Sequence, residues 1–218
     1  HAGCKVDATY GTLVMPPYFN STFERGEDGE YAHGNVYGRG SNPTRQLFEQ
    51  TMAQLEEADE AAAFSSGSAA FYAVFSALQQ GDHVLLPDDV YHGTRVLLEE
   101  VMQPLGVSYS TCDISDVDAV SDAIRTNTKL IILETPSNPL LKITSLAEVI
   151  DIAKAYQVAT IVDNTWSTPL ITQPLKFGAD LVLHSATKYI GGHSDVLGGV
   201  VCGMTDNPLW EKVKAIQG

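Results

Sequence analysis

The sequence predicts an α/β fold in which a mostly parallel sheet of the seven-stranded type is flanked by helices. From about residue 60 onward, short apolar runs alternate with helix-like stretches, which is the pattern of repeated strand-helix units. These runs look like strands that are buried on both faces. A third observation is a start rich in Gly, Pro, Tyr and Asn with weak periodicity, which predicts an extended arm ahead of the sheet.

Six apolar runs are the expected strands, and a shorter run after them is a candidate for a seventh. The six runs are residues 61–64, 83–86, 107–111, 129–133, 158–162 and 181–184. Residues 200–202 are the candidate for the seventh strand, which could be antiparallel to the others. Between the runs lie the expected helices, at residues 67–79, 93–103, 116–125 and 145–156.

Local signals mark where several helices begin. Asn42-Pro43 supplies an N-cap and a proline at the first helical position. The helix that follows continues through Leu47, Phe48, Met52 and Leu55. Ser145-Leu146-Ala147-Glu148 has the form of a capping box for the helix at 145–156. Residues 208–217 are again helix-like.

We expect two parts in the chain. Residues 1–43 form an arm that cannot build its own core, so it should pack on a neighbouring subunit. Residues 44–218 form one large domain, because no repeat or linker divides them. The chain begins at His1 without an initiator methionine and stops directly after a helix-like stretch. We therefore expect either a fragment or missing flanking residues, with the C-terminal portion absent.

The composition limits the classes of partner and ligand that we expect this chain to bind. The 218 residues carry 13 Lys+Arg against 27 Asp+Glu, a net charge of −14, which argues against nucleic-acid binding. No stretch approaches the ~20 apolar residues of a membrane span. The three cysteines are scattered without a CxxC pair, which indicates neither disulfides nor zinc and fits the cytoplasm. His184 and His193 are too isolated for a metal site, so we expect no metal.

One lysine stands out, in the run His184-Ser185-Ala186-Thr187-Lys188-Tyr189 directly after the strand at 181–184. A partly desolvated lysine loses its proton more readily and becomes a nucleophile toward carbonyl groups. Ser185 and Thr187 could donate hydrogen bonds to a phosphate beside it. The combination suggests a Schiff-base lysine that holds a phosphorylated aldehyde cofactor. The alternative is a polar turn with an ordinary surface lysine.

Four other strand ends carry suggestive residues. Ser66-Gly67-Ser68 is a small-residue turn whose backbone amides could bind an anion. Asp163-Asn164-Thr165 offers a carboxylate for a protonated ring nitrogen, or simply caps a turn. Two prolines in the loop at 134–139 would aim Asn138 inward, although a plain turn explains them equally well. Tyr91 could stack on a ring or only pack in its loop.

These segments gain weight from their common position. In an open α/β sheet, ligands bind beyond the carboxyl ends of the strands. All four segments, together with Lys188, follow a predicted strand. Independent coincidence at five strand ends is a poor explanation, so the sequence predicts a single site at this edge.

The order and spacing of these motifs strongly resemble the Cys/Met-metabolism family of pyridoxal-phosphate enzymes, over nearly the whole chain. This group includes cystathionine γ-synthase, cystathionine γ-lyase and methionine γ-lyase. The resemblance implies the fold type I large domain and pyridoxal 5'-phosphate as cofactor. The motifs that carry it are Tyr37-x-Arg39, Ser41-Asn42-Pro43-Thr44, Ser65-Ser66-Gly67, Glu134-Thr135-Pro136-Ser137-Asn138-Pro139, Asp163-Asn164-Thr165 and Ser185-Ala186-Thr187-Lys188-Tyr189.

The resemblance also implies roles for individual residues. Lys188 forms the Schiff base and later moves protons at the substrate α- and β-carbons. Asp163 holds the pyridine nitrogen, and Tyr91 stacks on the ring and assists proton transfer. Asn138 sits near the phenolic oxygen. The residues implied to hold the remainder of the cofactor, mainly its phosphate, are Gly67, Ser68, Thr165, Ser185 and Thr187.

On the arm, Tyr37 and Arg39 are implied to reach the phosphate of a neighbouring subunit. A dimer is then the minimal active unit, and a tetramer is the expected assembly. Gly93 stands where a cysteine is typical of methionine γ-lyases, which weighs against that activity. The arginine that binds the substrate carboxylate in the family lies beyond residue 218, so the residues present do not define the substrate.

The resemblance implies γ-elimination or γ-replacement on cystathionine or an acylated homoserine. Alternatives within the family are methionine γ-lyase, a homoserine-ester sulfhydrylase and cystathionine β-lyase. A different alternative is a cofactor-binding fragment without turnover, because the carboxylate-binding region is missing.

Overall fold

The computed structural model describes residue 3 and residues 6–217. Cys4 and the two ends of the chain therefore lie outside the described part. Seven strands form one sheet in the order β1-β7-β6-β5-β4-β2-β3. They are β1 (Glu60–Phe64), β2 (His83–Pro87), β3 (Ser108–Cys112), β4 (Thr128–Glu134), β5 (Ala159–Asp163), β6 (Leu181–His184) and β7 (Gly199–Gly203). The predicted α/β fold is confirmed.

The strand directions follow the chain connections. Strands β3, β2, β4, β5 and β6 are parallel neighbours, as crossovers through helices require. The candidate strand at 200–202 is real and antiparallel, because β7 pairs antiparallel with both β6 and β1. β4, β5 and β6 therefore end at the same edge of the sheet, and the predicted site residues follow them.

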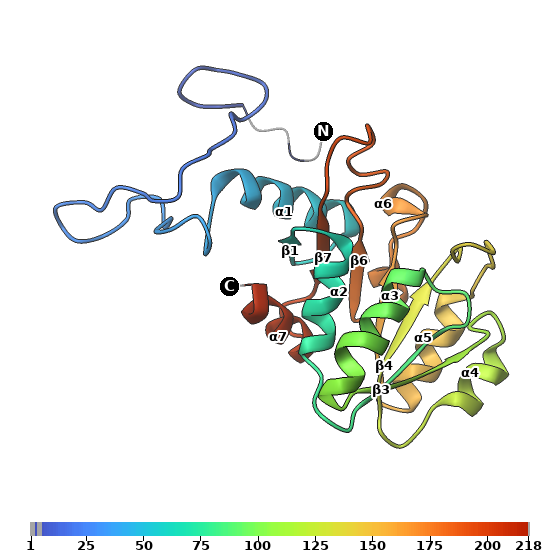
Figure 1. The fold of residues 1–218 in the computed structure, drawn as a ribbon. Coiled ribbons are helices and arrows are strands. Elements are labelled where there is room, and N and C mark those ends of the chain that lie inside the picture. Colours follow the sequence, from blue (N-terminus) through green and yellow to red (C-terminus); the bar gives the residue numbers. More distant parts are fainter. Residues whose placement is uncertain (1–2, 4–5, 218) are drawn as a thin grey trace.

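Helices cover both faces of the sheet (Figure 1). One face packs mainly against α2 (Gly67–Ser76), α3 (His92–Leu97) and α7 (Pro208–Gln217). The other packs against α4 (Val117–Ala123) and α5 (Leu146–Ala155), and against α1 (Pro43–Glu56) over β6 and β7. Strands β2, β4 and β7 are almost entirely buried, as expected for strands covered on both faces, whereas β3 is only partly buried. No helix among the described residues has the length and apolar character needed to cross a membrane.

Helix boundaries agree with most of the sequence signals. Asn42 caps α1, and its Oδ1 accepts a hydrogen bond from the backbone N–H of Thr44 at 2.9 Å. The helix expected at 93–103 begins as α3 and continues as a π turn at Leu98–Met102 and a 3-10 turn at Gln103–Leu105. A short helix α6 (Thr168–Ile171) and a 3-10 turn at Pro174–Phe177 were not predicted.

The expected capping box is wrong. Ser145 occupies the N-cap position of α5, but its side chain makes no capping hydrogen bond. Its backbone carbonyl still accepts a bond from Val149 N–H at 3.2 Å. The helix start is instead fixed by burial of Leu146, Val149 and Ile150 against the sheet.

The arm runs away from the body of the molecule (Figure 1). Its described part contains one isolated bridge, between Thr22 and Tyr37, and no strand. It is anchored near α1, where Tyr18 N–H donates to Thr44 Oγ1 at 2.8 Å. Apolar side chains along it are exposed, among them Leu13 and Phe19, which is 94% exposed. The arm has no core of its own in this chain, as its composition predicts.

Candidate active site

The carboxyl ends of β4, β5 and β6 bring the predicted residues together. Glu134 at the end of β4 pairs in register with Asp163 at the end of β5, and Asp163 pairs with Leu183 of β6. A cavity of about 230 Å³ lies at this edge and is lined by most of the predicted site residues. They are Gly67, Ser68, Tyr91, Asn138, Asp163, Thr165, Ser185, Thr187 and Lys188.

Asp163 forms the buried floor of the cavity, with 8% of its surface exposed. Its Oδ1 accepts a hydrogen bond from Thr165 N–H at 3.0 Å. Thr165 Oγ1 in turn accepts from Ser185 N–H at 2.8 Å, which ties the turn after β5 to the turn after β6. Burial raises the pKa of Asp163, while the hydrogen bonds from Thr165 and the charge of His184 oppose the rise. This carboxylate is therefore a strong site for a cation or a protonated nitrogen.

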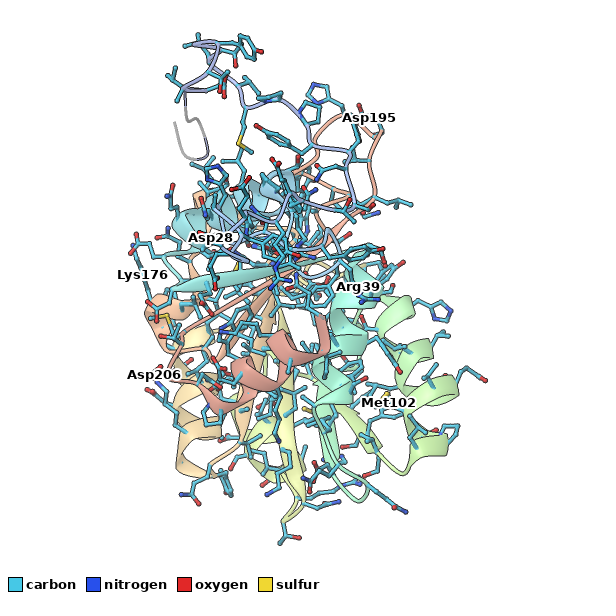
Figure 2. All side chains as sticks on the ribbon, turned by 90° about the vertical axis from the view of Figure 1, so that its left-hand side faces the viewer. Asp28, Arg39, Met102, Lys176, Asp195 and Asp206 are labelled. Atoms are coloured by element: carbon cyan, nitrogen blue, oxygen red, sulfur yellow. The ribbon has the colours of Figure 1, made fainter. Side chains whose placement is uncertain are left out.

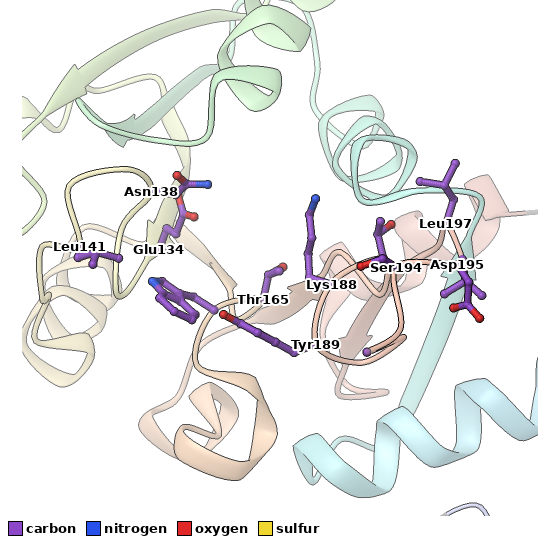
Figure 3. Close-up of a pocket in the computed structure, with 13 residues that line it drawn as sticks. Glu134, Asn138, Leu141, Thr165, Lys188, Tyr189, Ser194, Asp195 and Leu197 are labelled. Carbon is purple, nitrogen blue, oxygen red and sulfur yellow. The ribbon is translucent and has the colours of Figure 1, made fainter.

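Lys188 rises from the turn after β6 into the pocket. Figure 3 shows its side chain between Asn138 and Glu134 on one side and Leu197 on the other. The expectation of a partly desolvated lysine is wrong for this chain, because Lys188 is exposed. It lies where the small cavity meets a larger hollow of about 960 Å³, whose lining includes the exposed residues Tyr189 and Leu197.

The two predicted phosphate-binding turns touch each other. A Cβ on Gly67 would lie 2.9 Å from Ser185 Cβ, so only glycine permits this approach of α2 to the turn after β6. Ser66 caps α2 by accepting from Ala69 N–H at 3.1 Å. The first N–H groups of a helix have no partner within it and attract anions. The amides of Gly67 and Ser68 therefore offer an anion site beside Ser185.

The hydroxyl of Thr187 already has a partner in the chain. It donates to the carbonyl of Gly198 at 3.3 Å and accepts from the N–H of the same residue at 3.2 Å. This pair of bonds pins the lysine loop to the segment that leads into β7. A hydrogen bond from Thr187 to a phosphate requires its hydroxyl to turn away from Gly198.

Glu134 is a site residue to which the sequence argument gave no role. It is 6% exposed and lines both cavities. Burial first, and the charge of Asp163 second, raise the pKa of Glu134 to about 8. Its Oε2 accepts from Tyr91 N–H at 3.3 Å, which positions the tyrosine loop. The only available signal was a glutamate that ends an apolar strand.

Aromatic side chains form two further features of the site. Tyr91 is about half exposed, and a Cβ at Gly93 would lie 2.5 Å from its ring, so a larger residue there must displace the ring. Trp166 and Tyr189 stack with ring centroids 5.3 Å apart and 16° between their planes. Both line the larger hollow. The position of Trp166 in the sequence did not predict its contact with Tyr189.

Tyr37 and Arg39 do not join this cluster within the chain. Neither lines the two cavities at Lys188. The Arg39 guanidinium lies 5.4 Å from the centroid of the Tyr37 ring, so the two residues contact each other on the arm. Figure 2 shows Arg39 on the side of the molecule from which the arm projects.

Known proteins share this fold. The family model described as "Cys/Met metabolism PLP-dependent enzyme" matches residues 1–218. This chain belongs to that family. The resemblance noted in the sequence is therefore confirmed, and with it the dependence of the family on pyridoxal phosphate. The solved structure of metB from Corynebacterium glutamicum superposes with a TM-score of 0.95 at 45% identity, covering 100% of this chain and 57% of that one.

Relatives in the Cys/Met metabolism family carry several names at similar identity. The chain is 49% identical to a cystathionine gamma-lyase of Bacillus subtilis, over 92% of this chain and 53% of that protein. It is 46% identical to a cystathionine beta-lyase of Lactococcus lactis, over the same shares. A cystathionine gamma-synthase of Mycobacterium leprae is also 46% identical, over 92% of this chain and 52% of the relative. The chain spans about half the length of the curated relatives it matches.

Proposed function

We propose that the chain is the cofactor-binding part of a trans-sulfuration enzyme that performs γ-elimination or γ-replacement on cystathionine or an acylated homoserine. The observation that carries this proposal is the cavity in which the Lys188 amine and the buried Asp163 carboxylate face one space. Pyridoxal phosphate fits this donor set. Asp163 needs a cationic partner, the Gly67 turn suits a phosphate, and Lys188 is free to reach an aldehyde.

Each residue then has one task. Asp163 would hold the ring nitrogen, and Tyr91 would cover one face of the ring. The amides of Gly67 and Ser68, with Ser185 and Thr187, would bind the phosphate, while Thr165 would support Asp163 and Asn138 would lie near the phenolic oxygen. The bound cofactor supplies an aldehyde that condenses with amines and a ring that withdraws electrons. Lys188 would take the proton from the substrate α-carbon and then one from the β-carbon.

We also propose that residues 1–43 act between subunits and that residues 44–218 form the cofactor domain. The exposed apolar residues of the arm support this, because such residues seek a partner surface. Tyr37 and Arg39 would complete the phosphate site of a second copy. A dimer is then the smallest active unit, and a tetramer is the proposed assembly. The free thiols of Cys112 and Cys202 suit the cytoplasm, which we propose as its location.

The assay that tests this function separates two products. γ-Elimination of cystathionine releases cysteine, ammonia and 2-oxobutyrate, whereas β-elimination releases homocysteine, ammonia and pyruvate. We expect the complete protein to form 2-oxobutyrate, or to join cysteine to an acylated homoserine. Pyruvate as the main product would contradict γ-chemistry and favour the second candidate, a cystathionine β-lyase, which the 46% identical Lactococcus lactis relative supports.

A further inference from the structure

A buried acid-histidine pair joins helix α1 to the strand ends beneath the pocket. Glu56 is the last residue of α1, and His184 is the last residue of β6. Their side chains are both fully buried, with Glu56 Oε1 2.5 Å from His184 Nε2. Neither residue lines the two cavities at Lys188, so neither contacts a ligand there directly.

Glu56 also holds the residue next to Asp163. Its Oε1 accepts a second hydrogen bond from Asn164 Nδ2 at 2.8 Å. Asn164 is further fixed by donating from the same nitrogen to the Thr172 carbonyl at 2.8 Å. One carboxylate oxygen therefore links the residue after Asp163 with the residue before Ser185. A substitution of Glu56 should therefore alter the positions of both the turn after β5 and the turn after β6.

The pair also places a charge near Asp163. Burial raises the pKa of Asp163, and the hydrogen bonds from Thr165 and, as the smallest contribution, the charge of His184 lower it. A buried imidazole can keep a positive charge only beside an anion, and the acidic group that contacts the His184 ring is Glu56. The titratable groups involved come from every element around the pair: Glu56 from α1, Asp163 from β5 and Cys202 from β7. Burial and the negative charge of Glu56 both raise the pKa of the Cys202 thiol.

We propose that Glu56 and His184 form a buried ion pair that keeps Asp163 ionised and in place for the ring nitrogen of the cofactor. The inference rests on the proposed role of Asp163 toward that nitrogen. Glu56 and His184 are positioning residues, since they act through Asp163 and Asn164. The ionised Asp163 would favour the proton on the ring nitrogen over the proton on its own carboxyl group.

The test compares Glu56→Gln with Glu57→Gln in the complete protein loaded with cofactor. Glu57 is the next residue along the chain, but it is half exposed and pairs with Lys176, so it is a matched control. The readouts are the dissociation constant of pyridoxal phosphate and the 15N chemical shift of the labelled ring nitrogen. We expect Glu57→Gln to match the wild type. Glu56→Gln should weaken cofactor binding roughly tenfold and move the nitrogen signal toward that of an unprotonated ring.

Two outcomes distinguish a failure of the proposed Glu56–His184 ion pair from a failure of the proposed role of Asp163. A ring-nitrogen signal that Asp163→Asn changes but Glu56→Gln does not would overturn the inference alone. A signal that Asp163→Asn leaves unchanged contradicts the role of Asp163 and the inference with it. If Glu56→Gln fails to fold, the 15N shifts of His184 in the wild type decide the matter. An imidazolium at neutral pH supports the pair, and a neutral tautomer overturns it.

Discussion

Two buried histidines lie at opposite edges of the sheet and have different surroundings. His83 begins β2, and its two ring nitrogens lie 2.9 Å from the hydroxyls of Thr128 and Ser110. His184 ends β6 and pairs through Nε2 with a carboxylate, while its Nδ1 has no hydrogen-bond partner among the described residues. At the amino ends of the strands, the buried histidine therefore has only neutral hydroxyl groups as hydrogen-bond partners. The carboxyl edge gathers charges, which is a cost to stability that a binding site can use.

Glu134 and Asp163 add to this contrast. They are buried carboxyl groups on adjacent strands, and burial raises the pKa of both. A buried carboxylate pair destabilises a fold unless a cation compensates it. The carboxyl ends of the strands therefore hold more buried acid than the charge of His184 offsets, whereas His83 at the amino ends has neutral hydrogen-bond partners.

The largest expected effect comes from Lys188→Ala at the carboxyl edge. We expect the loss of the visible absorption band of bound cofactor and a fall in activity of at least about 10³-fold, because the nucleophile and the proton carrier are removed together. Lys176→Ala, at a half-exposed lysine, is the control. An unchanged absorption band in Lys188→Ala would rule out this lysine as the cofactor residue.

The next effect tests whether the edge is completed by a second subunit. Arg39→Ala and Lys188→Ala should each be nearly inactive alone. After the two variants are mixed and reassembled, half of the dimers contain one subunit of each variant. In such a dimer, one of the two sites combines Lys188 of one subunit with Arg39 of the other. Activity should then recover to about a quarter of the wild type. Arg25→Ala, another exposed arginine on the arm, should keep its activity, and no recovery on mixing would contradict a shared site.

The sequence predicted the strands, the edge and most residues of the small cavity, since apolar runs and strand ends are local signals. It missed contacts that depend on distant segments. Glu56 and His184 are 128 residues apart, and no periodicity separates buried Glu56 from exposed Glu57. The exposure of Lys188 and the Trp166–Tyr189 stack likewise depend on how loops lie around the pocket. The direction of β7 needed the register with β6 and β1.

A smaller effect should appear in the pH dependence of stability without cofactor. The pKa of Glu134 in the folded chain, about 8, lies above the ordinary value of 4.5. The unfolded state therefore binds fewer protons between these pH values, and this residue makes the fold less stable as pH rises through that window. Glu134→Gln should reduce the loss, measured by urea unfolding at pH 5 and pH 8. Glu148→Gln, at an exposed glutamate, is the control. If Glu134→Gln loses as much unfolding free energy between pH 5 and pH 8 as the wild type does, Glu134 is not the cause of the loss.

The smallest effect belongs to the amino edge and has the opposite sign. Burial, with a lesser effect of the Arg125 charge, lowers the pKa of His83 from 6.5 to about 4. Below pH 6.5 this histidine binds a proton in the unfolded state but not in the folded state. The free energy of unfolding therefore falls toward pH 4, by at most about 3 kcal/mol. His83→Gln keeps an amide for the Thr128 and Ser110 hydroxyls and has no proton to bind. It should flatten the urea-unfolding profile between pH 6.5 and 4, whereas exposed His193→Gln should not. Equal slopes in the two variants would contradict a lowered pKa of His83, because the folded chain would then accept the proton as readily as the unfolded chain does.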